Sequence, residues 1–422
     1  MANKRTKSKG VPRKYRPGNE REREDDKLQG VFAALMRSAA DLTKVKDPLD
    51  AEMFVSQTVA MWENAGLFDA DAEQILGLGA VRWAADEGSE RALALLVGLV
   101  ALGGPRVARR AATEVSKLTA AGRERPQWAD AVGNASFIEA WVAEHEFGDA
   151  DMIGMVFSHE GWEPHALGVL IDHNLNSMAK DVLVATDAGG LRSAWEEIPE
   201  TTIRSVTAQD VATRLAAGLE AEGMYLEAPS TEELKKGRAL IRSRLRGLPQ
   251  PRPLQRPIMD DASRDQLERE FTEGAEARGL DRDALEDIVF RIIGFSCDYG
   301  CGDPLRWSPT VVELFMTDWL PRKALLEGPP ESVPDVMRAW VRFAGRKRGV
   351  SQGSVQEAVE SVARWEKEML GAMEDPSRQG HAKAIVSALM DEGIDPTDQA
   401  AVNAWMEDFN SRPEEARKAV LG

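Results

Sequence analysis

Cysteine is nearly absent from this chain, which has only Cys297 and Cys301 among its 422 residues. Two thiols cannot form a disulfide framework, and 43% hydrophobic residues are enough for ordinary globular cores. We therefore expect a reducing compartment, the cytoplasm. The CxxxC pair has no second pair or neighbouring histidine, whereas structural zinc usually takes four ligands, so the spacing predicts free thiols and no metal site.

Long apolar runs are also missing. The most apolar stretch, residues 92–102, is about half the ~20 residues that a membrane-spanning helix needs. Residues 1–17 are charged throughout and lack the apolar centre of a secretory signal. We therefore expect no association with a membrane.

Familiar catalytic motifs are absent as well. The glycine-rich segment 294–304 lacks the GxxxxGK[ST] or GxGxxG spacing that cradles phosphate, and the chain has no GxSxG, HExxH or kinase motif. We therefore expect no nucleotide or other cofactor.

Basic residues are fewer than acidic ones, but they are concentrated in two segments. Lys and Arg number 53 against 70 Asp and Glu, a net charge of -17, which argues against general wrapping of nucleic acid. Residues 1–17 and 235–256 are nevertheless basic and free of acids. They predict contact with nucleic acid or with a protein partner, although a solvated linker helix or docking within the chain also explains the second run. The candidate binding residues there are Lys235, Lys236, Arg238, Arg242, Arg244 and Arg246.

The apolar pattern is mostly helical. Gly66, Gly88, Gly103 and Gly122 separate segments rich in Ala, Leu and Val, as glycines beyond helix ends do. Residues 151–187 instead contain short runs rich in Val and Ile, which predict a small antiparallel β meander. The sequence therefore predicts a mostly α fold: a helical array or bundle with this meander inserted, followed by a C-terminal helical domain.

Four domains or segments follow from these patterns. Residues 1–27 are expected to be a disordered basic tail and residues 28–227 a helical domain with the β insertion. Residues 228–261 are expected to form a basic helix and a linker, since 248–257 holds four prolines. The C-terminal helical domain is expected to span 262–422.

Helix starts are marked by capping residues. Ser230 with Glu233 and Ser354 with Glu357 have capping-box spacing, and Asp395 precedes Pro396 at another expected start. Ser308 and Pro309 begin a further helix, which Pro321 is expected to end.

Four of the five histidines, His145, His159, His165 and His173, fall within 29 residues and alternate with acids. Such a cluster is the usual place to look for a metal or catalytic site. In a hairpin centred on residues 161–164 the pleat places His159 and His165 on opposite faces. His165 and His173 would lie about 26 Å apart on a strand, or ~12 Å along a helix, too far to share one ion.

The spacing leaves His165, Asp172 and His173 as separate candidates that each need a partner from another segment. Asp172 and His173 are neighbours on a strand and so point to opposite faces. His145 follows Trp141 in a helix-like run, where a histidine complements the helix dipole.

Residues 163–181 and 302–345 resemble segments of uncharacterised bacterial proteins from high-GC Gram-positive lineages. The resemblance covers under a fifth of the chain. It implies a bacterial, cytoplasmic protein and brings no known activity or functional residues.

Two functions are consistent with these observations. The first is a non-catalytic interaction or scaffold protein that binds a protein or nucleic-acid partner through helical surfaces and local basic patches. The alternative is a metal-dependent hydrolase built on the His- and Asp-containing segment 145–173.

Overall fold

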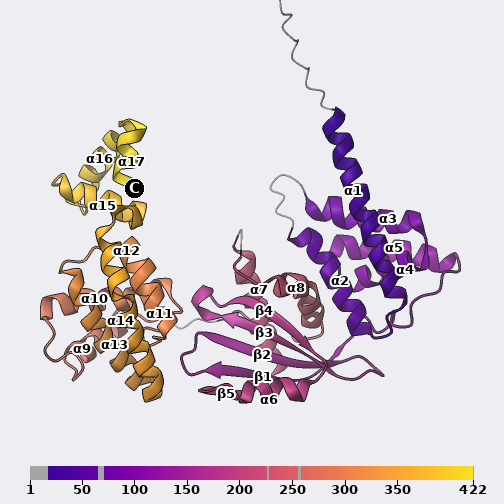
Figure 1. Ribbon diagram of the computed structural model, residues 1–422, viewed down its shortest axis with the longest axis horizontal. Coiled ribbons are helices and arrows are strands. Elements are labelled where there is room, and N and C mark those ends of the chain that lie inside the picture. Colours follow the sequence, from indigo (N-terminus) through magenta and orange to yellow (C-terminus); the bar gives the residue numbers. More distant parts are fainter. Residues whose placement is uncertain (1–17, 65–70, 226–227, 255–257, 422) are drawn as a thin grey trace, which may run out of the picture. The chain divides into compact units, whose positions relative to one another are not determined.

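The computed structural model describes residues 18–64, 71–225, 228–254 and 258–421 (Figure 1). It confirms the expected mostly helical fold with one small antiparallel sheet. The chain forms two compact units. Unit 1 comprises 1–138, 157–165 and 231–249, and unit 2 comprises 139–156, 166–230 and 250–422. The return from unit 1 to unit 2 at Pro249 and Gln250 falls within the proline-rich segment.

Unit 1 is a group of helices packed around one core: α1 (Gly18–Ser38), α2 (Pro48–Glu63), α3 (Leu78–Glu87), α4 (Glu90–Leu102), α5 (Pro105–Ala120) and α8 (Glu232–Arg246). Helix α4 is apolar nearly all round because it is buried along most of its length. Gly98 lets α2 approach it closely, since a Cβ there would lie 2.3 Å from Val55 Cγ2. Two short turns, η1 (Ala39–Thr43) and the π-helical η2 (Glu73–Gly77), connect the helices.

Glycines and small polar residues set these helix ends as expected. Gly88 closes α3 in the left-handed conformation at φ 60°, and the Ser89 hydroxyl then caps α4. Gly103 follows α4. Gly66 lies outside the described residues, as do residues 1–17 of the basic tail.

The sheet has five strands in the order β4-β3-β2-β1-β5: β1 (Ser136–His145), β2 (Ala150–Ser158), β3 (His165–Asp172), β4 (Met178–Ala185) and β5 (Thr201–Ser205). It is larger than the expected meander over 151–187. The run to His145, expected to be helical, is strand β1, and β5 pairs antiparallel beside it. The buried run 140–143 (AWVA) suits a strand or a helix equally, so the pattern alone misleads.

Two helices cover the unit 2 part of the sheet. Trp195 of α6 (Ala188–Glu196) packs edge-to-face against Trp141 of β1, with ring centroids 6.2 Å apart. Helix α7 (Ala208–Gly223) lies against β4. The absence of a side chain at Gly218 allows close packing on the sheet, since a Cβ there would lie 2.7 Å from Ile171 of β3 and 3.3 Å from the backbone nitrogen of Ala179 in β4.

The C-terminal helices pack around Phe271, Trp340 and Phe343. They are α9 (Asp261–Thr272), α10 (Arg282–Gly294), α11 (Pro309–Glu313), α12 (Leu320–Lys323), α13 (Val333–Arg348) and α14 (Gln352–Glu374). The last helices, α15 (His381–Asp391), α16 (Gln399–Ser411) and α17 (Glu414–Leu421), share a small cluster around Trp405. Three-residue 3₁₀ turns occur at η3 (His173–Leu175), η6 (Pro330–Ser332) and η7 (Pro376–Arg378).

Several helix starts lie a few residues from the expected positions. Thr231 rather than Ser230 caps α8, Ser351 rather than Ser354 caps α14, and Asp398 rather than Asp395 caps α16. Each true cap accepts a hydrogen bond from a backbone N–H of the first turn, which spacing alone does not select among nearby polar residues.

The helix begun by Ser308 and Pro309 does not end at Pro321. It runs on through a π-helical stretch, η5 (Leu314–Trp319), into α12. Pro321 has no N–H to donate to the Thr317 carbonyl four residues back, and this carbonyl accepts instead from Arg378 Nη2 at 2.9 Å. A second π-helical stretch, η4 (Phe295–Tyr299), follows α10. No helix in the described part of the chain is long and apolar enough to cross a membrane.

Candidate functional site

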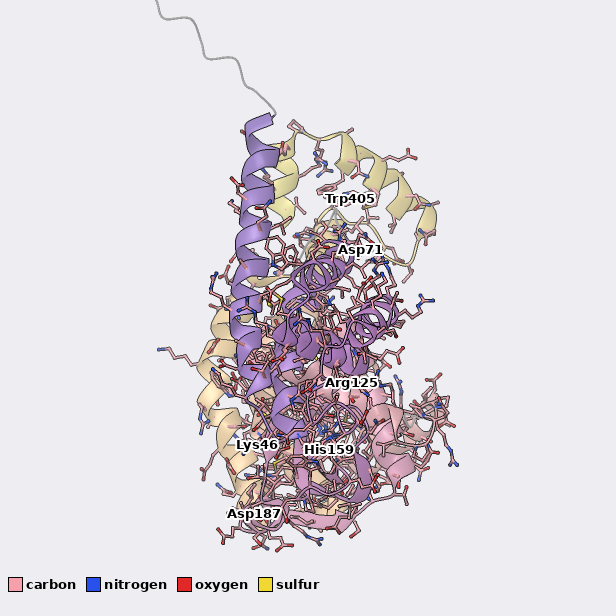
Figure 2. The ribbon with its side chains drawn as sticks, turned by 90° about the vertical axis from the view of Figure 1, so that its right-hand side faces the viewer. Lys46, Asp71, Arg125, His159, Asp187 and Trp405 are labelled. Carbon is pink, nitrogen blue, oxygen red and sulfur yellow. The ribbon has the colours of Figure 1, made fainter. Side chains whose placement is uncertain are left out.

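Two of the four clustered histidines meet inside unit 1. His159 follows β2, His165 begins β3, and both contact residues from helices far away in the sequence (Figure 2 labels His159). Their partners are Glu52 of α2 and Arg244 of α8. We call these four residues the buried His–Glu–Arg cluster. None of the four is more than 2% exposed.

The hydrogen bonds of this cluster fix its protons. The Arg244 Nη1 donates to Glu52 Oε1 at 3.1 Å, and Nη2 donates to Glu52 Oε2 and, at 3.0 Å, to His165 Nε2. A guanidinium only donates, so His165 carries its proton on Nδ1. Glu52 also accepts from the Gly133 N–H and from His159 Nε2, at 2.7 and 3.2 Å. The carboxylate is therefore held on both oxygens.

Electrostatics fix the charges of Glu52 and His165. Burial and the positive charge of Arg244 lower the pKa of His165 to about 3, so its imidazole is neutral at neutral pH. Burial raises the pKa of Glu52, but the hydrogen bonds from His159 and Arg244 outweigh it and lower that pKa to about 2. The result is a sealed ion pair flanked by histidines.

The expectation that His159 and His165 lie on opposite faces is wrong. Their rings stack, with centroids 5.3 Å apart. His159 lies just beyond the end of β2, where the pleat no longer dictates direction, and its carbonyl accepts from Trp162 N–H in the following turn. The alternation of side chains between the two faces holds only as far as Ser158, where β2 ends, and so does not determine the direction of His159.

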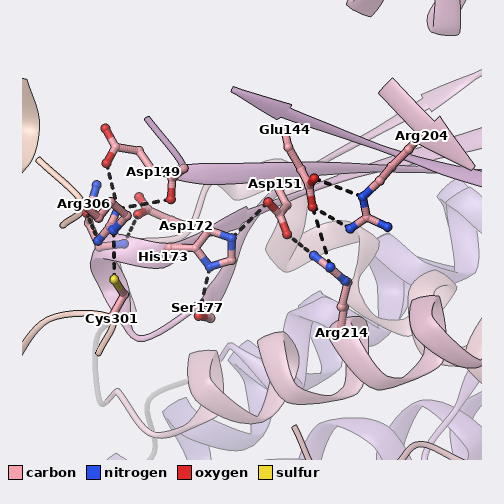
Figure 3. A network of polar contacts seen from close by, with 12 residues as sticks. Glu144, Asp149, Asp151, Asp172, His173, Ser177, Arg204, Arg214, Cys301 and Arg306 are labelled. Carbon is pink, nitrogen blue, oxygen red and sulfur yellow. Dashed lines mark hydrogen bonds and ion pairs between the residues drawn. The ribbon is translucent and has the colours of Figure 1, made fainter. Parts of the chain in front are cut away.

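His173 belongs to a different network, within unit 2 (Figure 3). Its Nε2 lies 3.1 Å from Asp151 Oδ1 of β2, and its Nδ1 lies 3.0 Å from the Ser177 hydroxyl. Because a carboxylate only accepts, His173 donates from Nε2 and accepts from Ser177 at Nδ1. This Ser177–His173–Asp151 chain therefore runs from hydroxyl through imidazole to carboxylate.

Asp151 is held ionised. Burial raises its pKa, but the hydrogen bond from His173 and the guanidinium groups of Arg214 and Arg204 outweigh that and lower the pKa. Arg214 of α7 pairs directly with Asp151, and Arg204 of β5 pairs with Glu144 at 2.7 Å (Figure 3). The guanidinium groups of Arg214 and Arg204 thus flank Asp151, the carboxylate end of the Ser177–His173–Asp151 hydrogen-bond chain.

Asp172 does not pair with its neighbour His173, as the strand geometry predicted. It accepts from the Asn174 N–H at 2.9 Å and forms an ion pair of 2.7 Å with Lys180. His165 and His173 likewise join separate networks at the two ends of β3. His145 lies in β1, and its Nδ1 accepts from the Phe147 N–H at 3.2 Å.

Arg306 is a further centre that sequence reasoning missed. It is buried and donates Nη1 to the Gly148 carbonyl and to Asp149, Nη2 to Asn174 Oδ1, and Nε to the Cys301 sulfur (Figure 3). Arg306 ties the sheet loops to the C-terminal helices within unit 2.

The basic helix α8 packs against α2 inside unit 1. Arg244 is buried with Glu52, Arg242 pairs with Glu63 at 2.5 Å, and Lys235 pairs with Glu232 at 2.7 Å. Arg238 donates to Asn64 Oδ1 at 3.1 Å and Arg246 donates to the Ala101 carbonyl, while Lys236 is exposed. Much of the positive charge of 235–246 is thus engaged within unit 1.

In the described part of the chain, no three His, Cys, Asp or Glu side chains are placed to hold a metal ion. Comparison with protein-family models, curated proteins and solved structures finds no match to this chain. Its function must therefore be inferred from its own geometry.

Proposed function

We propose that this chain is a non-catalytic interaction protein that binds a protein partner through its helical surfaces. The observation that carries the proposal is the closure of the buried His–Glu–Arg cluster. The side chains of Glu52, His159, His165 and Arg244 are at most 2% exposed and bond to one another. A catalytic site must reach its substrate, and this cluster has no group open to one.

Protein is a better partner than nucleic acid for the described surfaces. The ion pairs of α8 with Glu63 and Glu232 neutralise charge that phosphates would need, and the net charge of -17 repels them. Binding to duplex DNA at low salt that is lost in the Lys235→Gln/Lys236→Gln double variant would overturn this choice.

A surface of α10 suits a basic protein segment. Phe290 is 61% exposed there, beside a hollow of about 700 Å³ that is lined by Asp283 and Glu327 among other residues. Exposed aromatic side chains anchor protein interfaces, and acidic surroundings attract a basic partner.

A peptide alternating Lys and Leu, with its Glu and Leu counterpart, tests this surface by calorimetry. We expect the basic peptide to bind, and Phe290→Ala and Asp283→Asn to weaken binding by about tenfold or more, which is ~1.4 kcal/mol. Met390→Ala is the matched control, because Met390 is 57% exposed elsewhere in unit 2. Equal binding of the acidic peptide, or an unchanged Phe290→Ala variant, would refute the surface.

A second candidate function is hydrolysis through a serine, favoured by the Ser177–His173–Asp151 chain. Its hydrogen bonds run in the direction that general-base activation of a hydroxyl requires. Ser177 and Asn176 both adopt positive φ, 56° and 58°, a strained backbone that often occurs at functional sites. The hydrogen bonds of Ser177, His173 and Asp151 therefore replace the metal site as the basis for the enzyme alternative.

A fluorophosphonate probe distinguishes the two functions. An activated Ser177 would displace fluoride from phosphorus and become labelled, with its proton passing to His173 Nδ1. Labelling of the wild type that disappears in Ser177→Ala and falls strongly in His173→Gln would establish the enzyme and overturn the non-catalytic proposal. We expect no labelling above that of Ser177→Ala.

A further inference from the structure

A hollow of about 240 Å³ lies among the C-terminal helices of unit 2, where Asn174 and Arg306 also line it. Its walls include Phe295, Tyr299, Leu314 and Trp319, and its polar lining includes Arg322 and Lys323. Pockets for drug-sized ligands hold about 300–1,000 Å³, so this hollow suits a molecule of one or two rings.

Two of its walls are π-helical. In η4 the Gly300 N–H donates to the Phe295 carbonyl, and in η5 the Leu320 N–H donates to the Phe315 carbonyl, five residues back in each case. Such turns are rare and frequently occur at functional sites. Their meeting at one hollow is an observation independent of its shape.

The apolar wall is aromatic and partly open. Trp319 lies 5.4 Å from Phe295 and 5.6 Å from Tyr299, measured between ring centroids. Tyr299 is 61% exposed, although it is a large side chain beside an apolar core. A planar ring in the hollow would cover this aromatic surface and stack with it.

The charges of the lining do not cancel. Asp318 pairs with Arg322 at 2.8 Å, Asp303 with Arg348 at 2.6 Å, and Arg306 with Asp149 at 2.8 Å. Lys323 is exposed and forms no ion pair with the residues that the structure describes. One positive charge therefore remains at the hollow.

We propose that this hollow binds a small aromatic carboxylate, with its ring against Tyr299 and Trp319 and its carboxylate at Lys323. The aromatic wall accounts for the ring, and the uncompensated ammonium of Lys323 accounts for the carboxylate. This ligand site lies apart from the α10 surface and does not depend on it.

Calorimetric titration of the full chain with benzoate and indole-3-carboxylate tests the proposal, with benzamide and benzylamine as neutral and cationic analogues. Ligands of this size reach Kd values of roughly millimolar to micromolar. We expect saturable binding of a carboxylate and at least about tenfold weaker binding of the two analogues, which lack its charge.

Three variants locate the site. Lys323→Gln should weaken binding about tenfold, whereas Lys367→Gln, the same change at an exposed lysine of α14, should not. Leu314→Trp should fill the hollow and abolish binding without changing its charge, and circular dichroism verifies that this variant is folded. Tyr299→Ala should also weaken binding.

Each contrary result overturns the proposal. No saturable binding of either carboxylate at roughly 10 mM, well above the Kd expected for this size, rejects the ligand class. Equal binding of benzamide rejects the role of charge. Unchanged binding in both Lys323→Gln and folded Leu314→Trp rejects the hollow as the site.

Discussion

Glu52 of α2 and Arg244 of α8, 192 residues apart in the sequence, form a two-point ion pair that is sealed from solvent. Breaking a buried pair from one side leaves a charge without its partner. We expect Arg244→Met to lower the free energy of unfolding by about 3–5 kcal/mol in urea titrations. The matched control is Arg242→Met, whose arginine is 51% exposed beside Glu63. It should cost no more than about 1 kcal/mol, and equal losses would contradict the prediction.

Removing both charges should cost less than the sum of removing each. In Glu52→Gln/Arg244→Met no ion remains buried, so the desolvation penalty that dominates each single variant disappears. We expect a coupling free energy of about 1–3 kcal/mol from a double-mutant cycle of urea midpoints. Additive losses would show that the two side chains act independently.

The sequence predicted the fold better than the site. The Ser308–Pro309 start of α11 was expected because an N-cap residue and a first-turn proline are local signals carried by neighbouring residues. Glu52, by contrast, stands in an ordinary helical run, and nothing near it indicates burial against an arginine from α8. Contacts between distant segments have no local signature, so the partners of His159 and His165 could not be named.

The Ser177–His173–Asp151 hydrogen-bond chain also could not be predicted in full from local patterns. Spacing correctly separated Asp172 from His173 and His165 from His173. The true partners, Asp151 on the neighbouring strand and Ser177 beyond a tight turn, depend on strand pairing and on positive φ at Asn176 and Ser177. Neither property follows from residue type, since serine rarely adopts this conformation.

Acid should destabilise the protein before its carboxylates titrate. The pKa of His165 is about 3 in the folded chain and about 6.5 when unfolded, so between these values the unfolded state binds one more proton. Stability is therefore lost as pH falls from about 6.5, and Glu52, with a pKa lowered to about 2, adds its own loss only below about 4.5.

Urea unfolding between pH 7 and 5 measures this effect. His165→Gln should reduce the pH slope of stability by about one proton, whereas His381→Gln, at an exposed position that begins α15, should leave it unchanged. An identical slope in wild type and His165→Gln would mean that His165 titrates normally in the folded chain.

Gly154 permits the packing of Trp141 within the sheet. A Cβ at position 154 would lie 2.3 Å from the Trp141 ring, which is itself packed on Trp195. We expect Gly154→Ala to cost about 1–3 kcal/mol by overpacking. Gly371→Ala is the control, because no atom lies within 4 Å of a Cβ at that position in α14. It should stabilise the protein by up to about 1 kcal/mol, as alanine favours a helix. The opposite order of melting temperatures would contradict this account.

Replacing Arg306 by lysine should destabilise the protein. Its guanidinium donates from three nitrogens at once, to Asp149 and the Gly148 carbonyl, to Asn174 and to the Cys301 sulfur. A lysine keeps the charge but has one nitrogen and cannot span these acceptors, so at least one buried group loses its partner. We expect Arg306→Lys to lower the free energy of unfolding by about 1.5–3 kcal/mol, the cost of a hydrogen bond to a charged group. Arg282→Lys should have no measurable effect, because Arg282 is 84% exposed beside Glu286 and a lysine can form the same surface pair. If Arg306→Lys proves as stable as wild type, charge alone holds the loops of Asp149 and Asn174 to the C-terminal helices.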